Sequence, residues 1–345
     1  MKNLNIKAGP TAKKILKDRG LRPQDIRVIP AAAGGPKWMT LHPLYKFIFG
    51  EWLPQSDQRI KLIGASAGAW SMACAAQSQP IAAFEKYLKG YAEQKYPTAP
   101  TPEEISENCN SIIYGLLGEK GITEILKPKR YNLNVITSPS IFPYKSSNLK
   151  RKLFTAAFWN LISRKNLGKY FERNVFSVAP SQLVLEDEIP TKHIQLNKEN
   201  IHQALLASGA IPTIIAPIII DNKVHWDGGI TDYHLDLKYN ADDGIVLYPH
   251  FHKEIIPGWL DKYVRLRKSS VENHHRTVLV YPSDEFINSL PGKKIPTRDD
   301  FKTYFKKDDR RIEMWYKSIS RCEELADEFK TLVSQPIAAE DISDF

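Results

Sequence analysis

Short apolar runs alternate along the chain with segments in which apolar residues recur every three or four positions. Apolar runs bounded by turn residues are typical of buried strands, and the wider spacing is typical of helices. The predicted strands cover Ile26–Ile29, Ile60–Ile63, Leu133–Thr137, Val175–Val178, His193–Leu196, Lys223–Trp226, Gly244–Tyr248 and Thr277–Tyr281. The predicted helices cover Thr11–Arg19, Pro36–Phe49, Ser66–Ala76, Ile81–Tyr91, Leu149–Ser163 and Ile201–Ser208, with another starting near Pro102. This alternation predicts a three-layer α/β fold, in which helices cover both faces of a mainly parallel central sheet.

The C-terminal part of the chain has strand signals and one long helical candidate, Asp299–Val333. Apolar residues recur there at intervals of three and four, as in a heptad seam. Such a seam either joins two chains or packs on its own domain, and we favour packing because Asp308 interrupts the apolar row. We therefore expect residues 1–240 to form the main domain and residues 241–345 to form an extension packed on it. The oligomeric state stays open.

The predicted strand Ile60–Ile63 runs into Gly64-Ala65-Ser66-Ala67-Gly68, which opens a helix of small residues. A strand, a sharp turn and a helix around Gly-x-Ser-x-Gly are typical of the nucleophile elbow of serine hydrolases. Glycines suit this turn because it is strained and has no room for Cβ atoms beside the serine. Ser66 would lie at a helix N-terminus, where amide groups favour developing negative charge. The same residues also fit a purely structural turn, so the pentapeptide alone does not decide.

A second glycine turn, Ala33-Gly34-Gly35-Pro36-Lys37, follows the strand Ile26–Ile29 and precedes a helix that starts at Pro36. The amides of Gly34 and Gly35 are free to point at an anion, such as the oxyanion of an acyl-transfer intermediate. A phosphate-binding loop is the alternative interpretation. We rank it lower because neither of the two common glycine-rich phosphate motifs is present.

A third motif, Asp227-Gly228-Gly229, closes the predicted strand Lys223–Trp226. By itself it is a common turn, but after two glycine turns its aspartate is a candidate base for Ser66. In this order the three motifs resemble those of the patatin-like phospholipases, the bacterial and plant lipid acyl hydrolases. The resemblance covers about residues 26–229. It includes Ala207-Ser208-Gly209-Ala210-Ile211-Pro212, which is similar to a segment that the family carries before its aspartate.

The resemblance implies a patatin-like catalytic domain within residues 1–240 and a Ser–Asp dyad that works without histidine. Ser66 is then the nucleophile and Asp227 the general base, and backbone amides hold the oxyanion. The amides assigned to that role belong to Gly34, Gly35 and Ala67, and the motif-supporting residues are Lys37, Gly64, Gly68 and Gly228. The chain departs from the family pattern at Ala33 and Trp38, where glycine is usual. The implied activity is lipid acyl hydrolysis, as by a phospholipase A or an esterase, with no metal or organic cofactor.

Histidine is the competing base. His225 would share a strand face with Asp227, and Ser66, Asp227 and His234 follow the chain order of three-part α/β hydrolases. A histidine-assisted serine would favour an acyltransferase or a thioesterase, and a third interpretation is a catalytically silent lipid-binding or membrane-associating protein. His250 and His252 would supply two metal ligands, but a third ligand at a recognisable spacing is missing from the sequence, so we predict no metal site.

Positive charge is concentrated in residues 127–173, which hold eleven Lys or Arg against the single acidic residue Glu172, a local balance of +10. The formal net charge of the whole chain is +9, so the remainder is close to neutral. Within this window Phe154, Phe158, Leu161 and Ile162 fall at helical spacing. A basic segment with such a face suits peripheral contact with an anionic membrane, as a lid or an anchor. The alternative is a core-facing helix with a solvated basic flank.

The expected partner is a lipid or ester substrate, and we expect no nucleic acid because no recognition motif is present. Residues 1–7 lack the apolar run of a signal peptide, and no window has the roughly 18 apolar residues of a transmembrane helix. Three scattered cysteines, Cys74, Cys109 and Cys322, indicate neither a disulfide scaffold nor a metal knuckle. These features predict a cytoplasmic protein that also contacts membranes peripherally if its basic segment serves that purpose.

Overall fold

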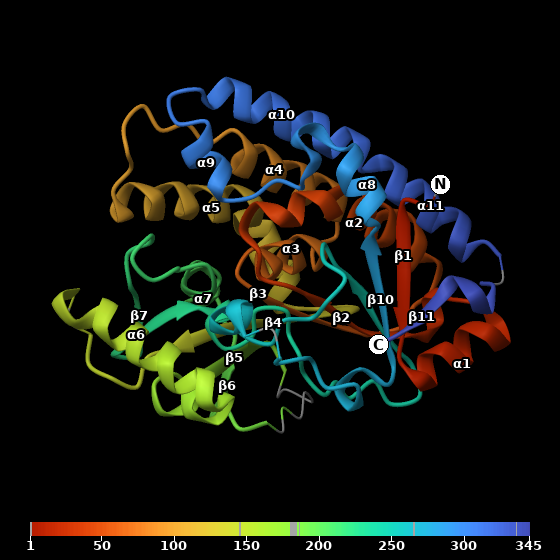
Figure 1. Cartoon of the computed structure of the whole chain (residues 1–345), viewed down its shortest axis with the longest axis horizontal. Coiled ribbons are helices and arrows are strands. Elements are labelled where there is room, and N and C mark those ends of the chain that lie inside the picture. The colour runs from red at the N-terminus through yellow and green to blue at the C-terminus, as the bar shows by residue number, and fades with distance from the viewer. Residues whose placement is uncertain (1, 145, 180–184, 186, 265, 336) are drawn as a thin grey trace.

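The computed structural model describes residues 2–144, 146–179, 185, 187–264, 266–335 and 337–345 (Figure 1). Within them the strands form one sheet in the order β11-β1-β10-β9-β2-β3-β4-β5-β6, with β8 paired to β4 and β7 paired to β8. Their bounds are β1 Leu4–Ala8, β2 Ile26–Ala31, β3 Ile60–Ala65, β4 Tyr131–Pro139, β5 Arg173–Ser177, β6 Thr191–Gln195, β7 Ile218–Ile220, β8 Lys223–Asp227, β9 Ile245–Pro249, β10 Thr277–Pro282 and β11 Ile342–Asp344. Five adjacent strands, from β10 through β9, β2 and β3 to β4, run parallel. The predicted α/β fold with a mainly parallel sheet is therefore confirmed.

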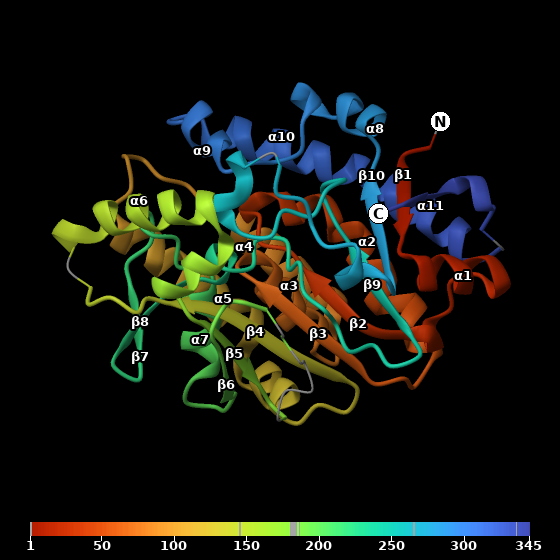
Figure 2. The same cartoon turned by 60° about the horizontal axis from the view of Figure 1, so that its bottom comes forward.

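The helices of the described residues have the bounds α1 Pro10–Arg19, α2 His42–Phe47, α3 Ala67–Ala75, α4 Pro80–Ala92, α5 Pro102–Leu126, α6 Ser146–Ile162, α7 Ile201–Ser208, α8 Asp284–Ser289, α9 Asp299–Thr303, α10 Asp308–Arg321 and α11 Glu323–Val333. Figures 1 and 2 show α10 passing along α4, and α6 at the opposite end of the molecule from β1 and α11. Every residue of α3 is buried, because this helix lies between the sheet and the layer formed by α4 and α5. None of these helices has both the length and the apolar composition needed to cross a membrane.

The sequence patterns missed the strands at one edge of the sheet. β1 alternates buried and half-buried residues, pairs antiparallel with β10 and pairs parallel with β11. Its five residues are too few for the alternation to be distinguished from a turn or a frayed end. The predicted C-terminal strands, observed as β9 and β10, lie between β1 and β2 in the same sheet. Residues 241–345 therefore supply strands to the central sheet itself.

The single helix predicted over Asp299–Val333 is instead three helices, α9, α10 and α11. The first break contains Lys306 in the left-handed region, with φ of 60°, which no continuous right-handed helix accommodates. The seam nevertheless packs as expected on its own chain. The Phe329 ring of α11 lies 5.6 Å from the Trp52 ring and 6.2 Å from the Phe47 ring, measured between ring centroids.

The helix predicted over Pro36–Phe49 is also interrupted. A 3-10 helix covers Gly35–Leu41, α2 follows, and a π turn covers Ile48–Trp52. Pro43 explains the first change because proline has no N–H to continue the hydrogen-bond ladder from the preceding turn. The consequence is that the segment after the glycine turn is irregular where the sequence predicts a regular helix.

Candidate active site

Ser66 and Asp227 meet where two strands end beside β4. β3 pairs with β4 up to Ala65 opposite Ile136, and β8 pairs with β4 from Thr137, which lies opposite Asp227. β5 occupies the other side of β4, so β8 continues the line of β3 in the antiparallel direction. The two strand ends therefore face each other. Ser66 Oγ donates a hydrogen bond of 2.7 Å to Asp227 Oδ2, and both residues are buried.

The backbone of Ser66 is strained. Its φ of 56° and ψ of −133° lie in a region that residues other than glycine rarely adopt, at a cost of about 1–3 kcal/mol. Close packing of α3 holds the turn in place. A Cβ atom on Gly64 would lie 2.5 Å from the nitrogen of Ala69, and one on Gly68 would lie 2.1 Å from the carbonyl oxygen of Ala31. Both glycines are therefore needed so that the backbone of α3 can approach β3 and the end of β2.

The Asp227 carboxylate has a fixed orientation. Its Oδ1 accepts a hydrogen bond of 2.7 Å from the Gly229 amide, which leaves Oδ2 for Ser66. Burial raises the pKa of Asp227, and the hydrogen bonds from Ser66 and Gly229 oppose that rise. Gly228 lets the turn pass β4 closely, because a Cβ atom there would lie 2.3 Å from the carbonyl oxygen of Ile136. The arrangement provides a desolvated carboxylate aimed at a serine hydroxyl.

Ser208, at the C-terminal end of α7, supports the elbow from behind. Its Oγ accepts a hydrogen bond of 2.8 Å from the Ser66 amide and donates one of 2.6 Å to the carbonyl oxygen of Ile136. It thereby connects the serine turn to β4. Ser208 lies in the segment that resembles the family, but its sequence context predicts no role for it, because a serine 142 positions from Ser66 has no local signal for such a contact.

The glycine turn that was predicted to hold the oxyanion lies beside this pair. Ser66, Asp227 and Gly34 line one cavity, Gly35 has a left-handed φ of 55°, and Ala67 is the first residue of α3. In the described part of the chain, the Gly34, Gly35 and Ala67 amides donate no hydrogen bond to a protein acceptor. A Cβ atom on Gly34 would lie 2.6 Å from the ring of Phe251, so a larger residue would displace the turn.

The two departures from the family pattern have different structural settings. Trp38, where glycine is usual, stacks on Tyr87 with a centroid distance of 3.9 Å, and the Tyr87 hydroxyl donates to the carbonyl oxygen of Ala67. The tryptophan thus packs behind the turn and connects it to the start of α3. Ala33 is buried, and its amide donates to the carbonyl oxygen of Tyr233. Neither side chain replaces the free amides of the glycine turn.

The structure does not bring a histidine to Ser66. His225 Nδ1 lies 2.9 Å from the hydroxyl of Thr137, and burial lowers the pKa of His225 to about 4. His234 Nδ1 is within hydrogen-bond distance of the backbone of Glu254 and Ile256, and burial lowers its pKa well below the usual value. The described residues include no group of three or more His, Cys, Asp or Glu placed to hold a metal ion.

The cavity that this pair lines has a volume of about 370 Å³, and several of its lining residues are basic. Ser66, Asp227 and Gly34 line it, and its apolar lining includes Ile211 and Ile214. The basic residues that line it are Lys37, Lys262, Arg298 and Lys302, and Asp299 is the acidic lining residue besides Asp227. Lys37 Nζ lies 3.5 Å from the Tyr233 hydroxyl, and burial lowers the pKa of Lys37. Of these four cations, only Lys37 belongs to a motif that the sequence shows.

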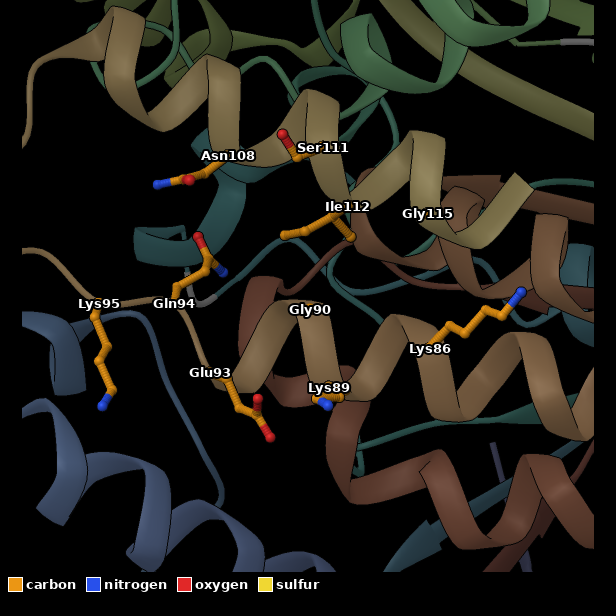
Figure 3. Close-up of a pocket in the computed structure, with 10 residues that line it drawn as sticks. All are labelled: Lys86, Lys89, Gly90, Glu93, Gln94, Lys95, Asn108, Ser111, Ile112 and Gly115. Carbon is orange, nitrogen blue, oxygen red and sulfur yellow. The ribbon is translucent and has the colours of Figure 1, made fainter. Parts of the chain in front are cut away.

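A larger hollow of about 540 Å³ lies between α4 and α5 and shares no lining residue with this cavity (Figure 3). Figure 3 shows the side chains of Lys86 and Lys95 pointing in different directions, and Lys95 forms an ion pair of 2.7 Å with Asp309. These charges do not converge on a common point. The hollow contains none of the residues predicted from the motifs.

Comparison with known proteins supports one assignment. No curated protein matches the chain. Among solved structures, VipD from Legionella pneumophila matches with 12% sequence identity and a TM-score of 0.32, over 73% of this chain and 54% of that one. The chain thus spans about half the length of that protein. A family model described as patatin-like phospholipase matches residues 56–234, which is slightly more than half of the chain. The chain therefore belongs to the patatin-like phospholipase family.

Proposed function

We propose that this protein is a serine lipid acyl hydrolase, acting as a phospholipase A or an esterase through a Ser66–Asp227 dyad. The observation that carries the proposal is the hydrogen bond of 2.7 Å between Ser66 Oγ and Asp227 Oδ2, two residues that line one cavity. A serine hydroxyl becomes a competent nucleophile when a base within hydrogen-bond reach takes its proton. Desolvation raises the pKa of Asp227 and makes its carboxylate a stronger base than an exposed aspartate.

The proposed reaction has two halves. In the first, Ser66 Oγ attacks the ester carbonyl carbon and its proton passes to Asp227 Oδ2. The amides of Gly34, Gly35 and Ala67 stabilise the oxyanion, each contributing about 3 kcal/mol to lowering the barrier. The C–O bond to the leaving group then breaks, and the departing alkoxide takes the proton from Asp227. In the second half, water loses a proton to Asp227 and attacks the acyl-enzyme, and the released Ser66 oxygen recovers that proton.

The histidine alternatives have less support. His225 and His234 have their Nδ1 atoms engaged with Thr137 and with the backbone around Glu254, and burial disfavours their charged forms. A catalytic histidine must accept a proton and carry a positive charge in the transition state. An acyltransferase or thioesterase with a histidine base is therefore a weaker candidate than a dyad hydrolase.

Covalent labelling by a fluorophosphonate tests the proposal, because such compounds phosphonylate activated serines. We expect the native protein to be labelled and the Ser66→Ala variant to resist labelling. Ser71→Ala is the matched control, since Ser71 is a buried serine of α3 whose hydroxyl donates to the carbonyl oxygen of Ala67 within its own helix. Labelling is measured by intact-protein mass. A native protein that resists labelling would favour the catalytically silent lipid-binding protein instead.

We further propose that α6 docks the protein on an anionic membrane surface. The protein-facing side of α6 buries Leu149, Ala156 and Asn160. The residues on its other side, here called the α6 apolar face, are Phe154, Phe158, Trp159, Leu161 and Ile162, with exposed fractions of 75, 52, 43, 55 and 63%. The alternative in which this stripe packs into the core is therefore wrong. Five large apolar side chains exposed together on one helix indicate an interaction surface.

Charge near the α6 apolar face identifies the kind of partner. Residues 146–171 include six basic residues and no acidic one. Four of the six are exposed, namely Lys150, Arg151, Lys165 and Lys169. An anionic lipid surface offers both apolar depth for the aromatic rings and negative headgroups for the basic side chains.

The protein-facing side of α6 and the segment after it are connected to the cavity. Asn160 and Arg164 donate hydrogen bonds of 2.6 and 3.3 Å to the carboxylate of Asp261, which belongs to the 3-10 helix Trp259–Tyr263. Trp259 and Lys262 of this helix line the cavity. Docking through α6 would therefore hold the cavity close to the lipid.

The double variant Phe154→Ser/Phe158→Ser tests this docking. We expect its binding to phosphatidylcholine vesicles that contain phosphatidylserine to fall by about tenfold or more, because two exposed rings no longer enter the lipid. Raised salt should weaken binding of the native protein. Ile81→Ser is the matched control, since Ile81 of α4 is 40% exposed and lines a different hollow. Co-sedimentation with the vesicles measures binding. Equal binding by native protein and double variant would contradict the proposal.

A further inference from the structure

Three basic residues that follow the family-matched segment line the cavity of the proposed dyad, namely Lys262, Arg298 and Lys302. Lys262 lies on the 3-10 helix Trp259–Tyr263, Arg298 is the residue before α9, and Lys302 lies in the last turn of α9. In the part of the chain that the structure describes, none of these three forms an ion pair with an acidic side chain. Isolated lysines on a protein surface usually extend into water. Here all three cations line the same cavity as the proposed nucleophile Ser66.

Two of the three cations are held in defined positions. Lys262 Nζ lies 4.0 Å from the centroid of the Tyr233 ring and 5.7 Å from that of Trp259, which is cation–π geometry. The Arg298 guanidinium lies 3.5 Å from the position that a Cβ atom on Gly35 would take. One cation is thus fixed between aromatic rings and another lies against the proposed oxyanion turn. Both cations also oppose the rise in the pKa of Asp227, so an anion held by both would share the cavity with an ester carbonyl at Ser66.

Repulsion among the positive charges that line the cavity favours the binding of an anion there. Burial, with further contributions from Lys37 and Arg298, lowers the pKa of Lys262 to about 7, and the carboxylates of Asp227 and Asp299 oppose this only in part. Like charges gathered in a partly buried cavity disfavour one another, and a bound anion relieves that cost. The anion should therefore bind most tightly when all of these cations are protonated.

We propose that Lys262, Arg298 and Lys302 form a binding subsite for a phosphate group carried by the acyl ester substrate. The inference rests on the proposed acyl hydrolase function. Phosphate fits because several oxygens share its charge and can accept from donors in separate segments, including the planar guanidinium of Arg298. All three residues lie outside residues 56–234, the segment that matches the family model. The subsite is thus a property of this chain's own C-terminal part.

A matched pair of soluble esters tests the subsite. One is the hexanoyl ester of glycerol methyl phosphate, a phosphodiester with one fixed negative charge, and the other is its uncharged methyl ether analogue. We expect kcat/KM of the native protein to favour the charged ester by about a hundredfold, and the preference to fall about tenfold in Arg298→Met and in Lys262→Met. Lys89→Met is the control, since Lys89 lines the other hollow, and it should retain the native preference.

The pH dependence of the preference for the charged ester distinguishes a role of the Lys262 charge from a purely structural role. Raising the pH through about 7 deprotonates Lys262, so the preference for the charged ester should decline in the native protein. Lys262→Arg should keep the preference at high pH because guanidinium stays charged. An unchanged preference in both Met variants, or a pH profile that Lys262→Arg leaves as in the native protein, would overturn the subsite.

Two further measurements are needed. One distinguishes a membrane lipid from a soluble ester as the source of the phosphate, and the other distinguishes failure of the subsite from failure of the hydrolase function. Comparing the soluble charged ester with a long-chain phospholipid in vesicles shows whether the phosphate belongs to a membrane lipid or to a soluble ester. If the native protein hydrolyses both matched esters equally, the hydrolase stands and the subsite fails. If it hydrolyses neither ester but binds glycerol 3-phosphate, and Arg298→Met weakens that binding at least fivefold, the subsite stands and the hydrolase fails.

Discussion

Replacing Asp227 by asparagine should reduce ester hydrolysis by about a thousandfold to ten-thousandfold while leaving the fold intact. An asparagine side chain fits the same space, and its oxygen can still accept from the Gly229 amide. It cannot take the proton of Ser66, whose hydroxyl now donates at 2.7 Å to the carboxylate. The measurement is kcat/KM on a soluble short-chain ester, with chemical denaturation to follow folding.

The same substitution has a defined effect on stability. The pKa of Asp227 is raised in the folded protein, so its favourable contribution is fully present below the pKa of the unfolded chain and is lost as pH rises through the folded value. At neutral pH the buried charge therefore destabilises the fold, and Asp227→Asn should unfold at the same or a higher denaturant concentration than the native protein. For hydrolysis the raised pKa has the opposite consequence, because the base is active only when ionised. As the pH is lowered, hydrolysis should therefore be lost at a higher pH than it would be with an exposed aspartate as the base.

Histidine variants complete this test. His225→Gln and His234→Gln should each keep hydrolysis within about tenfold of native, since neither histidine contacts the dyad. A loss of about four orders of magnitude in either one would replace the dyad with a triad. Retention of activity in Asp227→Asn would remove Asp227 from the mechanism.

Gly68→Ala should destabilise the protein by about 3 kcal/mol or more, because the added methyl group has no space. A Cβ atom there would lie 2.1 Å from the carbonyl oxygen of Ala31 and 2.7 Å from that of Ala32. Backbone atoms cannot turn aside as a flexible side chain can, so α3 must move away from the end of β2. That movement would displace Ser66 at one end and the segment leading to Gly34 at the other.

Equilibrium unfolding in urea measures this effect. Gly115→Ala is the matched control, since Gly115 is an exposed residue of α5 and a Cβ atom there meets nothing within 4 Å. Alanine in a helix should stabilise that variant by up to about 1 kcal/mol. Similar stability of Gly68→Ala and the native protein would mean that α3 lies farther from β2 than the structure places it.

The sequence was sufficient to predict the fold class and to single out Ser66 and Asp227, which the structure brings into contact, because each prediction depends on local signals. Apolar runs mark the parallel strands, and the glycines around Ser66 mark a turn that few other residues allow. The way in which Ser66 and Asp227 meet was not predictable. It depends on β8 pairing with the last residues of β4, beyond the point where β3 ends, and no local pattern specifies which strand takes that place.

The other features that the sequence did not predict depend on contacts between segments far apart in the chain. Lys262 and Arg298 are single charges in irregular segments, and in sequence they look like solvated surface residues. The apolar residues of α6 raise a different difficulty, since periodicity identifies an apolar stripe but not whether it faces the protein. Packing of Leu149 and Ala156 against the domain decides this question, because it leaves the apolar stripe of α6 facing solvent.

The cavity that contains the proposed dyad is lined by different parts of the chain. Ser66 and Asp227 fall inside the family-matched segment, whereas Lys262, Arg298 and Lys302 fall after it. In the proposed enzyme, reactivity and selectivity therefore reside in separate segments, and exchanging Lys262, Arg298 and Lys302 for the residues of a relative would change substrate choice while Ser66 and Asp227 stay in place.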